Sequence, residues 1–170
     1  GTPVRGDFFQ YTKKEAREKL GINDDRPLLL SFFGSLGAAV MNDHMTAILS
    51  REVRMGAPFH HIHGAGRDYA GMRARLEQEG LRVDGDSVKL ANDPKDTGVE
   101  LREYIYDMPL IMAAADLVVC RAGASTISEL TAIAKPAVLV PSPNVVADHQ
   151  TKNARVLSDR GAALLVSEQE

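Results

Sequence analysis

Short runs of apolar residues alternate along this chain with longer segments in which apolar residues recur at helical spacing. The apolar runs predict buried strands at residues 28–33, 58–63, 99–105, 117–120, 137–140 and 162–166. The helical spacing predicts helices at residues 38–54, 69–79, 108–114, 126–134 and 150–159. This alternation is typical of an α/β, Rossmann-like fold, with a parallel sheet, helices on both faces, and ligands bound beyond the carboxyl ends of the strands.

One polar, turn-rich segment interrupts the alternation. Residues 83–98 contain Asp-Gly-Asp and Asn-Asp-Pro sequences, so we expect a surface insertion there within a single domain spanning residues 1–170. The last predicted strand is followed only by Ser-Glu-Gln-Glu, and we therefore expect that a closing carboxyl-terminal helix is absent.

Composition narrows the class of protein. The chain has 170 residues, 44% of them apolar and 25% charged, which suits one soluble domain with its own core. The net charge of −3 argues against a nucleic-acid partner. Cys120 is the only cysteine, so no intrachain disulfide forms, and we expect a small buried side chain rather than a catalytic thiol.

The turn at residues 121–129 is the most informative candidate site. Small residues follow the strand that ends at Cys120, and a helix pattern begins with Glu129 in its first turn. Gly123 would allow a sharp turn, and free N–H groups at a helix start attract a phosphate. Since phosphate repels a carboxylate, Glu129 should face hydroxyl groups, such as a sugar diol. A second interpretation is a capping box with Thr126 as N-cap, and the two are compatible.

Other candidate sites are weaker. Residues 34–38, Gly-Ser-Leu-Gly-Ala, lie between a strand and a helix, where phosphate binds in doubly wound folds, although a plain tight turn explains this loop better when it is taken alone. His61 and His63 share one face of a strand, but zinc needs further ligands, so we expect no metal and give His63 a site-lining role. His149 and Gln150 open the last helix and are candidates to bind a ligand.

Several separated motifs resemble the carboxyl-terminal half of the MurG family of peptidoglycan N-acetylglucosaminyltransferases. They are residues 1–5 (Gly-Thr-Pro-Val-Arg), 33–38 (Phe-Gly-Ser-Leu-Gly-Ala), 104–108 (Tyr-Ile-Tyr-Asp-Met), 121–129 and 148–154 (Asp-His-Gln-Thr-Lys-Asn-Ala). Thr2 and Phe33 stand where the family has asparagine and glycine. The resemblance implies half of a two-domain GT-B glycosyltransferase, the half that binds UDP-N-acetylglucosamine.

The resemblance also implies roles for individual residues. Glu129 would accept hydrogen bonds from the ribose, and Ile105 would offer its backbone to uracil. The remaining residues would contact the diphosphate or the sugar: Arg5, Ser35, Ala124, Ser125, Thr126, His149 and Gln150.

The implied reaction is inverting transfer of N-acetylglucosamine to the lipid-linked acceptor, lipid I, to give lipid II, without a cofactor. The catalytic base and the acceptor surface would lie in an amino-terminal domain that this chain lacks, so no catalytic residue is expected here and the chain alone should be inactive. The full enzyme would be cytoplasmic, peripheral on the cytoplasmic face of the membrane.

Two alternatives remain. One is half of a UDP-sugar 2-epimerase, which shares the two-domain architecture but needs acid and base residues that are not evident here. The other is a non-catalytic nucleotide-sugar-binding subunit of a split glycosyltransferase. Product analysis and the complete reading frame would separate these alternatives from the transferase.

Overall fold

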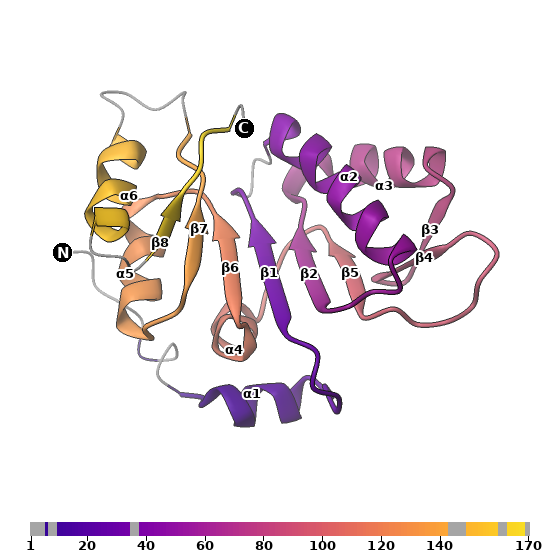
Figure 1. Cartoon of the computed structure of the whole chain (residues 1–170), viewed down its shortest axis with the longest axis horizontal. Coiled ribbons are helices and arrows are strands. Elements are labelled where there is room, and N and C mark those ends of the chain that lie inside the picture. The colour runs from indigo at the N-terminus through magenta and orange to yellow at the C-terminus, as the bar shows by residue number, and fades with distance from the viewer. Residues whose placement is uncertain (1–5, 7–9, 35–37, 143–148, 160–162, 169–170) are drawn as a thin grey trace. The chain divides into compact units, whose positions relative to one another are not determined.

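The computed structural model describes residues 6, 10–34, 38–142, 149–159 and 163–168 (Figure 1). The chain divides into two compact units. Unit 1 comprises Gly1–Asp25 and Asp107–Glu170, and unit 2 comprises Arg26–Tyr106. The structure confirms each helix and strand predicted from the sequence, with ends shifted by at most three residues.

Unit 2 contains a five-stranded sheet in the order β3-β4-β5-β2-β1. The strands β1 (Leu28–Phe32), β2 (His60–Gly64) and β5 (Val99–Arg102) are parallel, whereas β3 (Leu81–Asp84) and β4 (Ser87–Leu90) form an antiparallel extension. Helices α2 (Ala39–Arg54) and α3 (Tyr69–Gln78) pack against each other and against the sheet, with the short η2 (Gly66–Asp68) before α3.

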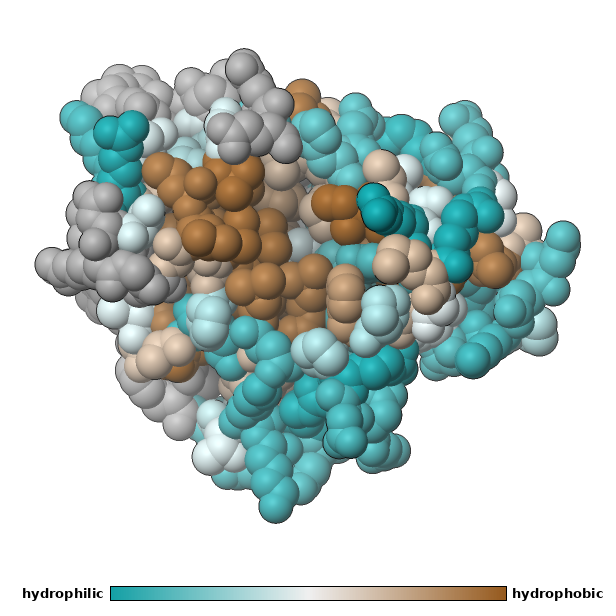
Figure 2. Space-filling view, in the orientation of Figure 1, coloured by the Kyte–Doolittle hydropathy of each residue, from teal (hydrophilic) through white to brown (hydrophobic). Residues whose placement is uncertain are grey.

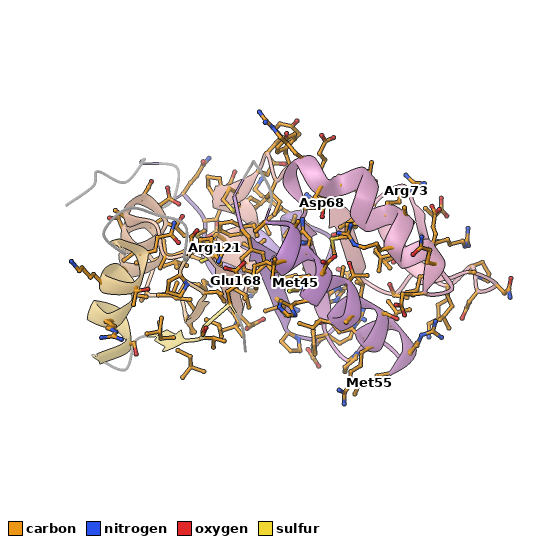
Figure 3. All side chains as sticks on the ribbon, turned by 90° about the horizontal axis from the view of Figure 1, so that it is seen from above. Met45, Met55, Asp68, Arg73, Arg121 and Glu168 are labelled. Carbon is orange, nitrogen blue, oxygen red and sulfur yellow. The ribbon has the colours of Figure 1, made fainter. Side chains whose placement is uncertain are left out.

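The core of unit 2 follows the apolar spacing of the sequence. Met45 and Leu49 on α2, and Met72 and Leu76 on α3, are buried at helical spacing. Met55 at the end of α2 is 63% exposed, and Figure 3 shows it pointing away from the helix at that end.

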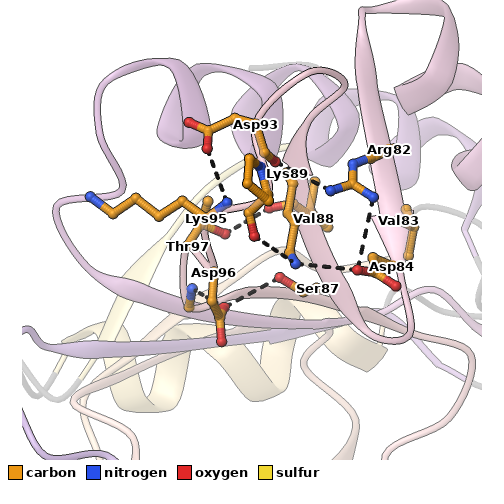
Figure 4. Close-up of polar contacts among 12 residues, drawn as sticks. Arg82, Val83, Asp84, Ser87, Val88, Lys89, Asp93, Lys95, Asp96 and Thr97 are labelled. Atoms are coloured by element: carbon orange, nitrogen blue, oxygen red, sulfur yellow. Dashed lines mark hydrogen bonds and ion pairs between the residues drawn. The ribbon is translucent and has the colours of Figure 1, made fainter.

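The strands β3 and β4 correct the sequence analysis, which assigned no strand to residues 83–98. Val83 pairs with Val88, and both are buried, so the segment contributes apolar residues to the core. Its polar residues bond to one another, as Lys89 Nζ does to Asp84 Oδ2 at 3.3 Å and to the Pro94 carbonyl at 3.1 Å (Figure 4). The many turn residues concealed the alternation of apolar and polar positions that marks the two strands.

Unit 1 contains three parallel strands in the order β6 (Leu117–Cys120), β7 (Ala137–Leu139) and β8 (Ala163–Leu165). Helix α5 (Ala124–Ala132) follows β6, and α6 (His149–Asp159) packs on α5 and β8. Figure 2 shows apolar side chains gathered over these strands on the face turned to the viewer, and Leu164 is 68% exposed.

The remaining helices of unit 1, α1 (Lys13–Lys19) and α4 (Met108–Ala114), pack against each other. Asp116, just before β6, forms ion pairs with Lys13 and Arg17 of α1. Lys135 Nζ donates to the carbonyls of Ala113 and Ala115 at the end of α4, and burial lowers the pKa of this lysine. No helix in the described ranges has both the length and the apolar character that crossing a membrane requires.

Gly98, which precedes β5, offers a test of the packing in unit 2. Its φ is +76°, and an added Cβ would lie 2.6 Å from His60 Nδ1 and 3.0 Å from Arg26 Nη2. Arg26 is held in place because its Nη1 donates to the carbonyls of Ala57 and Thr97. We therefore expect Gly98→Ala to lower the free energy of unfolding by about 2–4 kcal/mol, measured by urea denaturation.

Gly85→Ala is the matched control, because Gly85 also has a positive φ, +62°, but nothing lies within 4 Å of an added Cβ. It carries the backbone strain without the overlap, about 1 kcal/mol. Equal destabilisation by the two substitutions would contradict the proposed overlap with His60 and Arg26.

Candidate functional site

The turn between β6 and α5 presents the start of a helix. Gly123 is the N-cap, and α5 begins at Ala124. The N–H groups of Ala124, Ser125 and Thr126 precede the first helical hydrogen bond, which Ile127 N donates to the Gly123 carbonyl at 3.0 Å. Ala124 and Ser125 are exposed, so this helix start is accessible to an anion from solvent.

The capping-box interpretation of this turn is wrong. Because α5 begins two residues earlier than predicted, Thr126 is already the third helical residue and Glu129 lies in the second turn. The Glu129 side chain instead lies near Ser125, one turn earlier on the same helix, and its Oε1 is 3.5 Å from the donor Ser125 Oγ. A helix that starts at a glycine has no side-chain cap, and this leaves the N–H groups for another acceptor.

Neither the backbone conformation nor the surroundings of Gly123 require a glycine. Its φ of −67° and ψ of 149° are open to any residue, which corrects the expectation of a glycine-dependent sharp turn. A Cβ built at Gly123 meets nothing within 4 Å. The space beside the helix start is therefore open at this position.

Cys120 is an inert part of the core, as the sequence predicted. Its side chain is fully buried, and burial together with the negative charge of Glu129 raises the pKa of the thiol to about 12. A thiol with this pKa is not a nucleophile near neutral pH.

Gln150, at the start of α6, has a role that the sequence analysis missed. Its Oε1 accepts hydrogen bonds from the N–H of Ser142 at 2.8 Å and of Ala122 at 3.3 Å. One side chain therefore joins the turn after β6 to the turn after β7. Because Oε1 is engaged, only the Nε2 donor is left to contact a ligand.

Arg121 is a second residue of this turn that the sequence analysis did not single out. Its Nη1 lies 3.3 Å from the Val140 carbonyl and 3.2 Å from the Pro141 carbonyl, and its Nη2 lies 3.3 Å from Glu168 Oε1. Figure 3 shows Arg121 and Glu168 lying side by side. A single arginine among small residues at the end of a strand was the signal that could have identified it.

Ile105, the predicted uracil-binding residue, lies in unit 2 and follows β5. An added Cβ on Gly64 would lie 3.0 Å from Ile105 Cδ1, so the isoleucine covers the end of β2 with its side chain. Three of the residues named from the sequence lie outside what the structure describes: Arg5, Ser35 and the side chain of His149.

His61 and His63 of β2 are buried in the core of unit 2. In the described part of the chain, no group of three or more potential metal ligands occurs. His63 is fully buried, which corrects its predicted site-lining role, and its ring nitrogens lie 2.7 Å from Ser31 Oγ and 2.8 Å from Asn42 Oδ1. Burial, followed by the charge of His61, lowers the pKa of His63 to about 3.

The two hydrogen bonds of Gln150 can be tested by a pair of substitutions. Gln150→Ala removes the acceptor of both N–H groups, and we expect it to lower the free energy of unfolding by about 1–2 kcal/mol. Gln150→Glu retains an oxygen acceptor at the same place and should keep most of the stability. Urea denaturation measures both, and equal loss in the two variants would contradict the role of Oε1.

The buried ring of His63 makes stability depend on pH. Between pH 6.5 and about 3 the unfolded chain protonates this histidine while the folded chain does not, so stability falls as pH falls through this window. The contribution is at most about 1.4 kcal/mol per pH unit. We expect His63→Gln to flatten the pH dependence of thermal unfolding below pH 6.5, whereas substitution of the exposed His44 by glutamine should leave the slope unchanged.

Known proteins resemble this chain over its full length. A transferase from Acetivibrio thermocellus, named UDP-N-acetylglucosamine–N-acetylmuramyl-(pentapeptide) pyrophosphoryl-undecaprenol N-acetylglucosamine transferase, is 38% identical over 99% of the chain and 42% of its own length. A transferase of the same name from Salinibacter ruber is 40% identical, over 99% of the chain and 41% of its own length. The chain thus spans less than half the length of these relatives.

The solved structure of MurG from Acinetobacter baumannii has the same fold. It superposes with a TM-score of 0.69 at 29% identity, over 98% of this chain and 42% of the MurG chain. This match confirms the predicted α/β fold class of GT-B glycosyltransferases. Residues 28–170 match the model of the glycosyltransferase family 28 C-terminal domain. The chain therefore belongs to glycosyltransferase family 28, through the C-terminal domain of that family.

Proposed function

We propose that this chain is the donor-binding part of an inverting glycosyltransferase that moves N-acetylglucosamine from UDP-N-acetylglucosamine to lipid I in peptidoglycan synthesis. The observation that carries this proposal is the uncapped start of α5 at Gly123, followed by the half-buried Glu129. The names of the relatives describe the same donor sugar and an undecaprenol-linked acceptor, and they favour a transferase over an epimerase.

The diphosphate of the donor is assigned to the helix start. Three N–H groups and the positive end of the helix dipole favour an anion there, and the hydroxyl of Thr126 adds a donor, whereas the hydroxyl of Ser125 donates to Glu129. As the donor bond breaks, negative charge grows on the diphosphate, and fixed N–H groups stabilise that charge without rearrangement. Nε2 of Gln150 is a further donor within unit 1.

Glu129 is assigned to the ribose. Its carboxylate follows the N–H groups of the helix start by one turn, so it can accept hydrogen bonds from a diol without opposing the phosphates. In unit 2, the segment 34–38 is assigned to the phosphates and the backbone of Ile105 to uracil, both on the resemblance given above. The catalytic base, the lipid acceptor and contact with the cytoplasmic face of the membrane are assigned to the part of the relatives that this chain does not span.

Calorimetric titration of the chain with UDP-N-acetylglucosamine tests the proposal. We expect binding of UDP and of the UDP-sugar, with weaker binding of ADP. Glu129→Gln should weaken binding about ten-fold or more, because a hydrogen bond to a charged group contributes about 1.5–3 kcal/mol.

Glu77→Gln is the control, since Glu77 is an exposed carboxylate of α3 with a side-chain exposure of 55%. Unchanged affinity in Glu129→Gln, or equal affinity for UDP and ADP, would contradict the assignment of Glu129 and of the donor.

A further inference from the structure

Five buried polar side chains in unit 2 form a continuous chain of hydrogen bonds beneath helix α2. They are Ser31 of β1, Asn42 and Glu52 of α2, and His61 and His63 of β2, each no more than 5% exposed. The chain begins at Glu52 near the end of α2, crosses the two strands, and returns to Asn42 in the first turn of the same helix. We call these five residues the Ser31 circuit.

The orientation of Asn42 fixes one end of the circuit. Its Nδ2 lies 2.9 Å from the Ala65 carbonyl and 3.2 Å from Asp68 Oδ2, and both of these atoms accept hydrogen bonds. Asp68 remains a carboxylate, because the hydrogen bond from Arg75 lowers its pKa. Oδ1 of Asn42 must therefore face His63, and it can only accept.

His63 consequently carries a hydrogen on Nε2, which it donates to Asn42 over 2.8 Å. In the neutral ring Nδ1 is then an acceptor, and Ser31 Oγ, at 2.7 Å, donates to it. The hydroxyl of Ser31 has only one hydrogen, so it cannot also donate to His61. The contact of 2.7 Å between Ser31 Oγ and His61 Nε2 must be donated by the His61 ring.

The other nitrogen of His61 lies against a carboxylate. Nδ1 is 2.9 Å from Oε1 and 2.8 Å from Oε2 of Glu52. One more hydrogen is needed here, either on Nδ1, giving an imidazolium paired with a carboxylate, or on Glu52. In both arrangements the His61–Glu52 pair has the same number of hydrogens and no net charge. The pair therefore holds one proton more than a neutral histidine beside a glutamate anion.

The opposite direction of hydrogen bonding requires a charged His63. Both of its nitrogens would then donate, to Ser31 and to Asn42. Burial opposes that charge, and the pKa of His63 is lowered to about 3. The hydrogen bonds accordingly run one way, from the Glu52–His61 pair through Ser31 and His63 to Asn42.

The position of the circuit relates it to the donor site. Ser31 lies three residues before Gly34, and Asn42 lies four residues after Ala38. Hydrogen-bonded residues of the circuit therefore flank the segment 34–38 on both sides. We propose that Ser31, His61 and His63 are positioning residues, whose one-way hydrogen bonds hold the first turn of α2 against the ends of β1 and β2 and thereby align Gly34 and Ala38 for donor binding. This inference rests on the proposed function.

Nitrogen-15 NMR of the histidine rings tests the hydrogen positions in the whole chain, without ligand. At pH 7 we expect His63 to carry its hydrogen on Nε2 with a bare Nδ1, and His61 to carry one on Nε2. Asn42→Ala removes the acceptor that fixes the tautomer and should move hydrogen to Nδ1 of His63, whereas Ser31→Ala should leave it on Nε2. A bare Nε2 on His61, or a wild-type His63 with hydrogen on Nδ1, would overturn the one-way circuit.

Titration with UDP-N-acetylglucosamine tests the positioning role in protein shown to be folded by circular dichroism. Ser31→Ala interrupts the circuit, and we expect it to weaken donor affinity about ten-fold, comparable to the loss of one or two hydrogen bonds. Ser50→Ala is the matched control, because it removes a buried hydroxyl of α2, 6% exposed, that lies outside the circuit.

The failures of the two proposals are distinguishable. Wild-type donor binding with unchanged affinity in Ser31→Ala overturns the positioning role and leaves the proposed function intact. Absence of binding by the wild type overturns the proposed function together with the positioning role, while the NMR spectra still decide the direction of the hydrogen bonds.

Discussion

Ser31 has one hydroxyl hydrogen, and two buried imidazole rings lie 2.7 Å from its oxygen. In a buried core, each polar atom that is removed from water must find a partner, or it costs about 1–3 kcal/mol. Because one hydroxyl serves both rings and Oδ1 of Asn42 can only accept from His63, the hydrogen bonds from His61 to Asn42 all run in one direction. The packing of α2 on β1 and β2 is therefore constrained by hydrogen-bond direction as well as by the apolar side chains of the helix.

The same requirement shapes the candidate site in unit 1. Oε1 of Gln150 accepts from two loop N–H groups, and Arg121 donates to two loop carbonyls and pairs with Glu168. These side chains satisfy the backbone of the turns around the site. The start of α5 has no such side-chain partner, because its N-cap is Gly123. The turns are held in place by these side chains, and the helix start is left open. This combination gives a rigid site for an anion such as a phosphoryl group.

Much of the fold could be read from the sequence. Apolar runs located the parallel strands, because such strands are buried on both faces, and helical spacing located α2 to α6. The strands β3 and β4 were missed because charged residues and turn residues surround the few apolar positions, such as Val83 and Val88, that make the hairpin part of the core. The hairpin pairs with β5 through β4, and α3 contacts β3 while α2 contacts β4, and local pattern does not reveal these partners.

Two identical capping signals show that local sequence alone does not fix the first residue of a helix. Thr12 and Glu15 form a capping pair, and Thr12 is the N-cap of α1. Thr126 and Glu129 have the same spacing, yet α5 already starts at Ala124. The sequence determined the parallel strands, helices α2 to α6 and the candidate turn, because periodicity and residue size are local properties. Only the tertiary structure decided how Gln150 joins two loops and which way the hydrogen bonds of Ser31 run, because these depend on partners far apart in the chain.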